Sequence, residues 1–312
     1  YHAAGVAMTL QINRRAVLAG LGVCTLPRMA RSQSDPIADL VAQVDRMRVR
    51  QTVFDLSSFP TRWTPHPDFG AVEAWVAEAF GAHGPVQRQA FAMPSGKIRH
   101  NIIAGDLDDP RPRVIVGAHF DAISETPETD APGANDNATG IAAMLEAWRI
   151  LADLMPERQV SCMAFAGEEQ GFLGSTHAAS VVADEGWSVP LMLNLDMLGH
   201  RPRDPSAPMV IEYDMGKVDA AHAAAAQTHG ERARDLAAAH TTLNTMLTDI
   251  WGSDYMPFEA RGVPCSGLFD GGVEGALYHT TQDRPDRVDY GRLHQATRLA
   301  VAILADAAGI SA

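Results

Sequence analysis

Short apolar runs alternate with segments of helical periodicity through the middle of this chain. Residues 114–118, 160–166 and 191–195 are strand-like runs, and no polar side chain interrupts the first of them. Between the first two runs, apolar residues recur at helical spacing over 141–151, and a further helix is expected after Gly174. This alternation of strands and helices is typical of a largely parallel sheet with helices on both faces. The sequence therefore predicts an α/β fold.

The flanking segments extend the same fold. Apolar side chains at helical spacing predict helices over 37–47 and 72–80, and residues 86–93 and 102–105 are strand-like. The expected sheet is central and mixed, with most of its strands parallel. A chain of 312 residues with 46% hydrophobic content can bury a large core. Because no linker or internal repeat divides it, one domain is expected over residues 33–312.

The first 32 residues differ in character from the rest of the chain. Arg14 and Arg15 stand directly before the mostly apolar run 16–26, and Ala30 offers a small residue for processing. The run is too short to span a bilayer, and its place after paired arginines resembles a twin-arginine export signal. A short buried helix is the alternative. We expect residues 1–32 to be a signal peptide, and the processed protein to be periplasmic or secreted without stable membrane association.

The chain is acidic, with 25 Lys plus Arg against 38 Asp plus Glu and a formal net charge of −13. No basic cluster follows the N-terminal segment, so no nucleic-acid partner is expected. Cys162 and Cys265 lie in apolar runs without the spacing of a metal site. They are expected to be small buried residues, and a disulfide between them stays open. The sequence carries no signal for the oligomeric state.

Histidine and carboxylate side chains gather where the predicted strands end. His119 and Asp121 close the first buried run, Glu168 and Glu169 follow the second, and Asp196 closes the third. Ligands of such sheets bind beyond the carboxyl ends of the strands, so these side chains should meet in one cleft. Like charges held together are costly unless a cation neutralises them. Histidine with carboxylates suits Zn²⁺, with Mn²⁺ or Co²⁺ as alternatives, and the absence of cysteine ligands favours a catalytic metal.

The spacing within these groups suggests different roles for neighbouring residues. Adjacent residues of an extended chain point in opposite directions, so Glu168 and Glu169 cannot face one ion in the same manner. One of them can bind metal while the other acts on the water. The spacing of two between His119 and Asp121 puts both on one side, where Asp121 can fix the imidazole tautomer. Asp136 lies in a glycine-containing loop before a helix, where a carboxylate can lie between two ions.

Five sequence blocks carry these residues, in this order: His119-Phe120-Asp121, the loop 132–140, Gly167-Glu168-Glu169, Asn194-Leu195-Asp196 and Tyr278-His279-Thr280. Together they resemble the zinc aminopeptidase family with two co-catalytic metals, which includes bacterial leucyl aminopeptidase, aminopeptidase Y and glutamate carboxypeptidase. The resemblance covers roughly residues 101–283 and implies a single zinc-exopeptidase domain.

The resemblance also implies a ligand set for two zinc ions per chain. One zinc would be bound by His119 and Asp196, the other by Glu169 and His279, and Asp136 would bridge them. Glu168 would be the catalytic base, and Asp121 would orient the imidazole of His119.

The function implied by the resemblance is a metal-dependent exopeptidase that acts on peptides, and we expect an aminopeptidase that releases N-terminal residues. A carboxypeptidase of the same family is one alternative, with Arg201 and Arg203 as candidates to hold a terminal carboxylate. A single-zinc acyltransferase that resembles glutaminyl cyclase is another, and a binding module without activity is a third. Asp283 fits the family pattern and would orient the loop of His279. Tyr255 departs from it, because the family often has Ser-Asp-His where this chain has Ser-Asp-Tyr.

Overall fold

A computed structural model describes residue 1 together with residues 35–271 and 277–310. Its strands form one eight-stranded sheet in the order β1-β2-β4-β3-β5-β8-β6-β7. The strand bounds are β1 Val86–Ala92, β2 Ile98–Ala104, β3 Arg113–His119, β4 Gln159–Phe165, β5 Leu191–Asp196, β6 Met209–Tyr213, β7 Thr245–Asp249 and β8 Cys265–Phe269. The central strands β4, β3, β5 and β8 run parallel, whereas β2 joins β4 and β6 joins β8 in antiparallel fashion. The predicted mixed, largely parallel sheet is confirmed.

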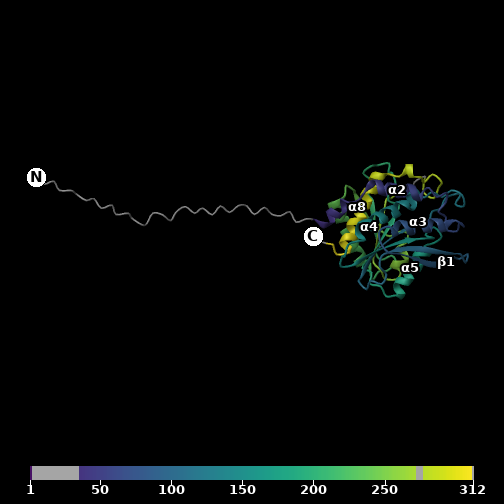
Figure 1. Cartoon of the computed structure of the whole chain (residues 1–312), viewed down its shortest axis with the longest axis horizontal. Coiled ribbons are helices and arrows are strands. Elements are labelled where there is room, and N and C mark those ends of the chain that lie inside the picture. Colours follow the sequence, from purple (N-terminus) through teal and green to yellow (C-terminus); the bar gives the residue numbers. More distant parts are fainter. Residues whose placement is uncertain (2–34, 272–276, 311–312) are drawn as a thin grey trace. The chain divides into compact units, whose positions relative to one another are not determined.

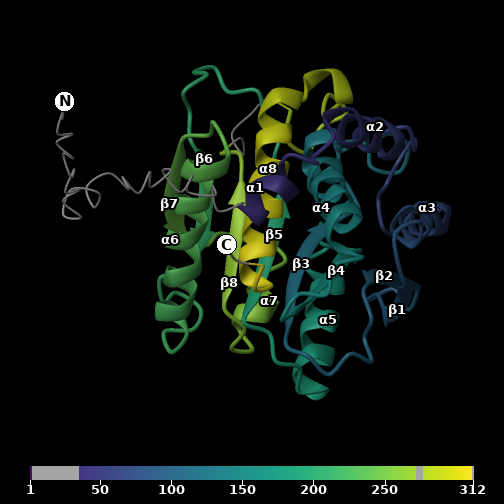
Figure 2. The ribbon, with the colours of Figure 1, turned by 60° about the vertical axis from the view of Figure 1, so that its left-hand side comes forward.

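Helices cover both faces of this sheet (Figures 1 and 2). Their bounds are α1 Pro36–Val41, α2 Arg46–Leu56, α3 Phe69–Gly81, α4 Thr139–Leu151, α5 Leu173–Asp184, α6 Ala223–His240, α7 Met256–Glu259 and α8 Tyr290–Ala307, with short turns η1 Ala134–Ala138 and η2 Pro285–Arg287. Helices α4, α6 and α8 lie on one face, and α1 and α2 pack against α8 and α4. Helix α5 contacts α7 and the strands β1 and β2 from the other face.

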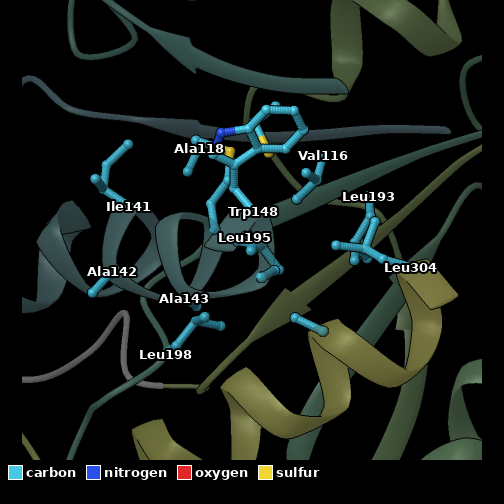
Figure 3. Packing of buried hydrophobic residues seen from close by; sticks show 14 of the residues in the cluster. Val116, Ala118, Ile141, Ala142, Ala143, Trp148, Leu193, Leu195, Leu198 and Leu304 are labelled. Atoms are coloured by element: carbon cyan, nitrogen blue, oxygen red, sulfur yellow. The ribbon is translucent and has the colours of Figure 1, made fainter. Parts of the chain in front are cut away.

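The alternation of side chains along the strands builds a separate apolar cluster on each face. Val116 and Leu193 face α4 and α8, where Trp148 and Leu304 pack against them (Figure 3). Neighbouring strand residues such as Ile115 belong to the other cluster, which α5 and α7 cover. Strands β3 and β4 are buried along their whole length, as expected for strands with helices on both faces.

The helix predicted over 37–47 is in fact two helices. Helix α1 ends at Val41, and Asp45 then begins α2 by accepting hydrogen bonds from the backbone N–H groups of Met47 and Arg48 at 2.8 and 3.3 Å. The apolar pattern continued across the break because Val44 is buried between the two helices. The side-chain cap of Asp45 therefore starts a new helix, although the apolar periodicity runs on through this point.

The two cysteines of the domain are free and buried. Cys162 belongs to the apolar cluster on one face of the sheet and Cys265 to the cluster on the other face, so both act as small core residues. The predicted export segment, residues 1–32, lies outside the described part except for residue 1. Among the helices that are described, none is long and apolar enough to cross a membrane.

Candidate metal centre

The candidate site lies at the carboxyl ends of the parallel strands, as predicted from the sequence. His119 and Asp196 are the last residues of β3 and β5, and residues 168–169 lie in the loop that follows β4. Asp136 comes from η1, just before α4, and His279 from the loop before η2. The topology thus brings together residues that are up to 160 positions apart along the chain.

Asp136 lies between two imidazoles and presents one carboxylate oxygen to each. Its Oδ1 is 3.2 Å from Nε2 of His119, and its Oδ2 is 3.2 Å from Nε2 of His279. Asp196 joins His119 and Asp136 in a first possible ligand group, with its Oδ1 3.4 Å from His119 Nε2. Glu169 joins His279 and Asp136 in a second group, with its Oε2 3.1 Å from His279 Nε2. The result is two groups of three ligands that share Asp136.

These residues fit a pair of divalent cations. Oδ1 of Asp196 and Oε1 of Glu169 are buried and have no hydrogen-bond partner, which is costly for a carboxylate unless a cation satisfies it. The donor set of imidazole nitrogens and carboxylate oxygens, without sulfur, is the set found around catalytic zinc. A further group within ligand distance is formed by His119, Glu168 and Glu169, so geometry alone leaves Glu168 close enough to be a ligand.

The electrostatics of the site also favour positive charge. Burial lowers the pKa of His279, but the carboxylates of Asp136 and Glu169 outweigh it and raise that pKa to about 10. Burial and the charge of Asp136 raise the pKa of Glu169 to about 7, against the opposing influence of His279 and His119. Burial raises the pKa of Glu168 well above its ordinary value, against the influence of His119, and Asp254 adds to the rise.

Asp121 contacts His119, as the sequence predicted, and also the backbone of Glu168 and Glu169. Its Oδ1 lies 3.6 Å from His119 Nδ1, as predicted, and its backbone carbonyl is 3.3 Å from the same nitrogen. The carboxylate also accepts hydrogen bonds from the backbone N–H of Glu168 at 3.2 Å and of Glu169 at 3.3 Å. The Thr64 hydroxyl donates to it at 2.9 Å. One buried aspartate therefore positions two of the predicted site blocks.

Asp283 and Arg62 hold the loop that carries Asp136. The carboxylate of Asp283 accepts hydrogen bonds from the backbone N–H of Asn135 at 2.8 Å and of Asp136 at 2.9 Å. Asp283 was expected to orient the loop of His279; its backbone N–H donates to the carbonyl of Thr280 in that loop at 3.1 Å, while its carboxylate binds the bridging loop. Arg62 is fully buried and donates to the carbonyls of Gly133 at 2.8 Å and of Pro132. Sequence analysis missed Arg62, since it lies upstream of every motif block.

The Ser-Asp-Tyr segment links the metal centre to a pocket beside it. Ser253 donates to Asp196 Oδ2 at 2.6 Å and accepts from the side-chain amide of Asn194 at 2.8 Å, so it fixes the position of a candidate ligand. Tyr255 is fully buried and donates to Glu212 Oε2 at 2.8 Å. The pocket has a volume of about 520 Å³, and His119, Asp136, Glu168, Asp196 and Glu212 are among the residues that line it.

A model of peptidase family M28 matches residues 101–304, which is well over half of the chain. The chain belongs to peptidase family M28. The matched region contains every residue of the two ligand groups described above, while Arg62 and Thr64 lie outside it.

Individual relatives of this M28 chain agree with that assignment. A "probable zinc metalloprotease" of Pyrenophora tritici-repentis is 30% identical over 192 residues, which cover 53% of this chain and 44% of the relative. The chain therefore matches less than half the length of that protein.

Solved structures share the fold. LapA aminopeptidase of Legionella pneumophila superposes with a TM-score of 0.76 at 17% identity, covering 88% of this chain and 75% of that chain. A glutaminyl cyclase of Bacteroides thetaiotaomicron superposes with a TM-score of 0.71 at 18% identity, covering 84% and 98%. At these identities the likeness concerns the fold alone, so it does not separate a peptidase from a cyclase.

Proposed function

We propose that this M28 chain is a zinc-dependent aminopeptidase that removes the N-terminal residue of peptides. The observation that carries the proposal is the charge of the pocket beside the two ligand groups. Asp136, Glu168, Asp196 and Glu212 line it, and no lysine or arginine of the described residues does. Glu168, which the proposed metals leave free, adds negative charge for a free α-amine, and the described lining of the pocket offers no lysine or arginine that would hold a terminal carboxylate.

Two zinc ions are proposed, one held by His119 and Asp196 and the other by Glu169 and His279, with Asp136 between them. Zinc bound there would polarise the scissile carbonyl and lower the pKa of a water molecule. The two groups share one carboxylate and lie at the ends of separate elements, which favours two ions over one. Metal analysis of the zinc-loaded protein tests the number: two ions per chain support a peptidase, and one supports the cyclase alternative.

The proton transfers are assigned to Glu168, which lines the pocket next to the ligand groups. Its carboxylate would accept the proton of the attacking water and pass it to the amine that leaves. Asp121 would keep His119 in one tautomer and fix the backbone on which Glu168 stands. Ser253 would hold Asp196 in place through the 2.6 Å hydrogen bond.

A carboxypeptidase is the second candidate, and Arg287 is the observation in its favour. Arg287 lines a neighbouring hollow of about 350 Å³ together with Asp136 and Asp283. Its side chain is 55% exposed and lies 3.6 Å from Asp286, so the guanidinium is already paired at the surface. Arg201 and Arg203, the candidates from the sequence, are exposed and line neither the pocket nor this hollow.

Blocked peptides decide between the two activities. One tripeptide is compared in its free, N-acetylated and C-amidated forms, with zinc-loaded protein. We expect the free and amidated forms to be cleaved and the acetylated form to resist. Cleavage that is blocked by amidation and indifferent to acetylation would overturn the proposal, and Arg287→Ala would then be the first variant to measure.

Export of the chain is also proposed, from the paired arginines and apolar run of residues 1–32. Replacing Arg14 and Arg15 with lysine should hold the precursor in the cytoplasm. N-terminal sequencing of the exported protein should find a start shortly after Ala30. An active cytoplasmic enzyme that retains its N-terminus would refute export.

A further inference from the structure

A buried carboxylate, Glu212, lines the proposed substrate pocket away from both ligand groups. It lies on β6 with only 6% of its surface exposed. Opposite it in the sheet stands Gly267, where a Cβ atom would come within 2.8 Å of Tyr255 and 3.0 Å of Glu212 Oε2. A glycine is therefore needed at this position for both side chains to fit, so the carboxylate sits in a space shaped for it.

Only one oxygen of Glu212 is satisfied within the protein. Oε2 accepts the hydrogen bond of the Tyr255 hydroxyl at 2.8 Å, and that hydroxyl in turn accepts from the backbone N–H of Trp251 at 2.8 Å. Oε1 has no hydrogen bond from a described residue, and it is not among the atoms closed off from solvent. Since Glu212 lines the pocket, Oε1 is the oxygen available to an occupant.

The charges around Glu212 leave it without a counter-ion. Burial raises its pKa to about 7, against the Tyr255 hydrogen bond, while Asp196 and Asp249 raise it and Lys217 lowers it. Lys217 directs its ammonium to the carbonyl of Ile250 at 2.9 Å and lies 5.4 Å from the centre of the Trp251 ring, so it is held beside the pocket by groups other than Glu212. A buried carboxylate of this kind is stabilised by a cation that enters the pocket.

The position of Glu212 suits a side chain rather than the α-amine of a substrate. In the sheet, β8 separates β6 from β5, the strand that ends at Asp196. Two strand spacings amount to roughly 10 Å. The α-amine must stay beside the scissile bond at the metal centre, whereas a long side chain with a terminal charge can reach across. Trp251, 70% exposed, lines the same pocket and offers an aromatic surface for the apolar stem.

We propose that Glu212 makes the enzyme selective for peptides whose N-terminal residue is lysine or arginine, with the cationic side-chain end bound at Oε1. This inference rests on the proposed aminopeptidase activity. Glu212 acts here as a specificity-determining residue, and Tyr255 positions it. The tyrosine that departs from the family's Ser-Asp-His pattern thus has a role in holding the acidic end of the pocket.

Lysyl and norleucyl p-nitroanilides test the proposal, because the two side chains differ mainly by the charged amine. We expect zinc-loaded enzyme to show a kcat/KM for the lysyl substrate at least about tenfold above that for the norleucyl substrate, as for a charge-assisted contact. Glu212→Gln should abolish this preference, with kcat/KM for the lysyl substrate falling at least about tenfold more than kcat/KM for the norleucyl substrate. Glu78→Gln, a matched change at an exposed glutamate of α3, should keep it.

The outcomes separate this proposal from the activity on which it rests. Equal cleavage of both substrates by the unaltered enzyme, or an equal loss of both in Glu212→Gln, overturns the role of Glu212 and leaves the aminopeptidase intact. Calorimetric binding of L-lysine and L-norleucine gives a readout that does not need turnover. Tighter binding of lysine in the absence of any hydrolysis would refute the proposed activity and support the acidic pocket. Equal binding of the two amino acids would refute the pocket, even if the Glu212 variant failed to fold.

Discussion

At the scale of single residues, the division of work between Glu168 and Glu169 is the sharpest feature of the site. Glu169 lies 3.1 Å from His279 and completes a ligand group with Asp136. Glu168 lines the pocket where a substrate would lie. The adjacent carboxylates can therefore do different work, one on metal and one on the proton of the water, although both are held by the same aspartate, Asp121.

Replacing Glu168 with glutamine should separate catalysis from metal binding. The amide keeps the size of the side chain but cannot accept the proton, so kcat should fall by about 10² to 10⁴. Zinc content and thermal stability should stay near those of the unaltered protein. Steady-state kinetics and elemental analysis of the same sample measure both quantities.

Asp136→Ala is the contrasting variant, because its two oxygens face different imidazoles. It should lose metal as well as activity. Near-normal turnover in Glu168→Gln, or its loss of zinc to the extent seen in Asp136→Ala, would show that the base and ligand roles are wrongly assigned.

The residues of the candidate site could be predicted where their position follows from a strand end. His119 and Asp196 terminate buried strands, so sheet topology brings them together without further information. Arg62 could not be found in this way. Apart from Leu56, its partners are backbone carbonyls about 60 to 70 positions further along the chain, and a bond to a carbonyl leaves no pattern in the partner's side chain.

At the scale of elements, the loop before α4 depends on the buried cation of Arg62. Arg62→Met keeps an apolar stem but leaves the carbonyls of Phe120 and Gly133 without their donor. Loss of a buried charged donor should lower the free energy of unfolding by about 3 to 5 kcal/mol. Because Asp136 follows this loop, zinc affinity should fall too.

Denaturant unfolding and zinc titration of Arg62→Met measure both effects. Arg48→Met is the matched control, since that arginine is exposed and its solvent-screened ion pair with Asp45 at 3.8 Å should contribute little to stability. If the two variants were equally stable, the bonds of Arg62 to the loop would not be what supports it.

Glu259 connects α7 to β8, and its burial makes that connection sensitive to pH. It is fully buried and accepts the backbone N–H of Cys265 at 2.7 Å. Burial raises its pKa from the ordinary 4.5 to about 7. Between these values the native protein binds more protons at this carboxyl than the unfolded chain does, so the contribution to stability is lost as pH rises.

Glu259→Gln removes this titration and keeps an oxygen for the Cys265 bond. Relative to the unaltered protein, the variant should therefore become more stable as pH rises from 4.5 to about 7. Denaturant unfolding of both proteins at pH 5 and pH 8 measures the change, and Glu78→Gln should show none. A difference in stability that is the same at both pH values would contradict the raised pKa.

At the scale of the whole molecule, the sequence was informative about the central parallel strands and less so about the edge of the sheet formed by β6 and β7. Buried parallel strands such as β3 are apolar throughout, which makes them easy to recognise. The short strands β6 and β7 were not predicted, and β7 is only partly buried, so its apolar pattern is weak. Yet β6 carries Glu212 and forms one end of the proposed pocket.

The described helices and strands indicate which part of the chain the domain needs to fold. All helices and strands that the structure describes lie within residues 36–307, and the first of them is α1. Asp35 caps this helix through the backbone N–H groups of Ile37 and Ala38 at 3.0 and 3.1 Å. A chain without residues 1–33 retains this cap, so we expect its stability and kcat/KM to match those of the full chain.

A second truncation, without residues 1–44, shows whether the comparison can detect a loss. It removes α1, which buries Ile37, Leu40 and Val41 and packs against α8. Each such side chain contributes about 1.5 to 3 kcal/mol when fully buried, so this chain should unfold at a clearly lower denaturant concentration. The cap of α2 by Asp45 is retained in both, so the difference reports on α1 and on the buried Val44 that follows it. If removal of residues 1–33 alone cost as much as removal of 1–44, those residues would be part of the folded domain, and the boundary drawn from the export signal would be wrong.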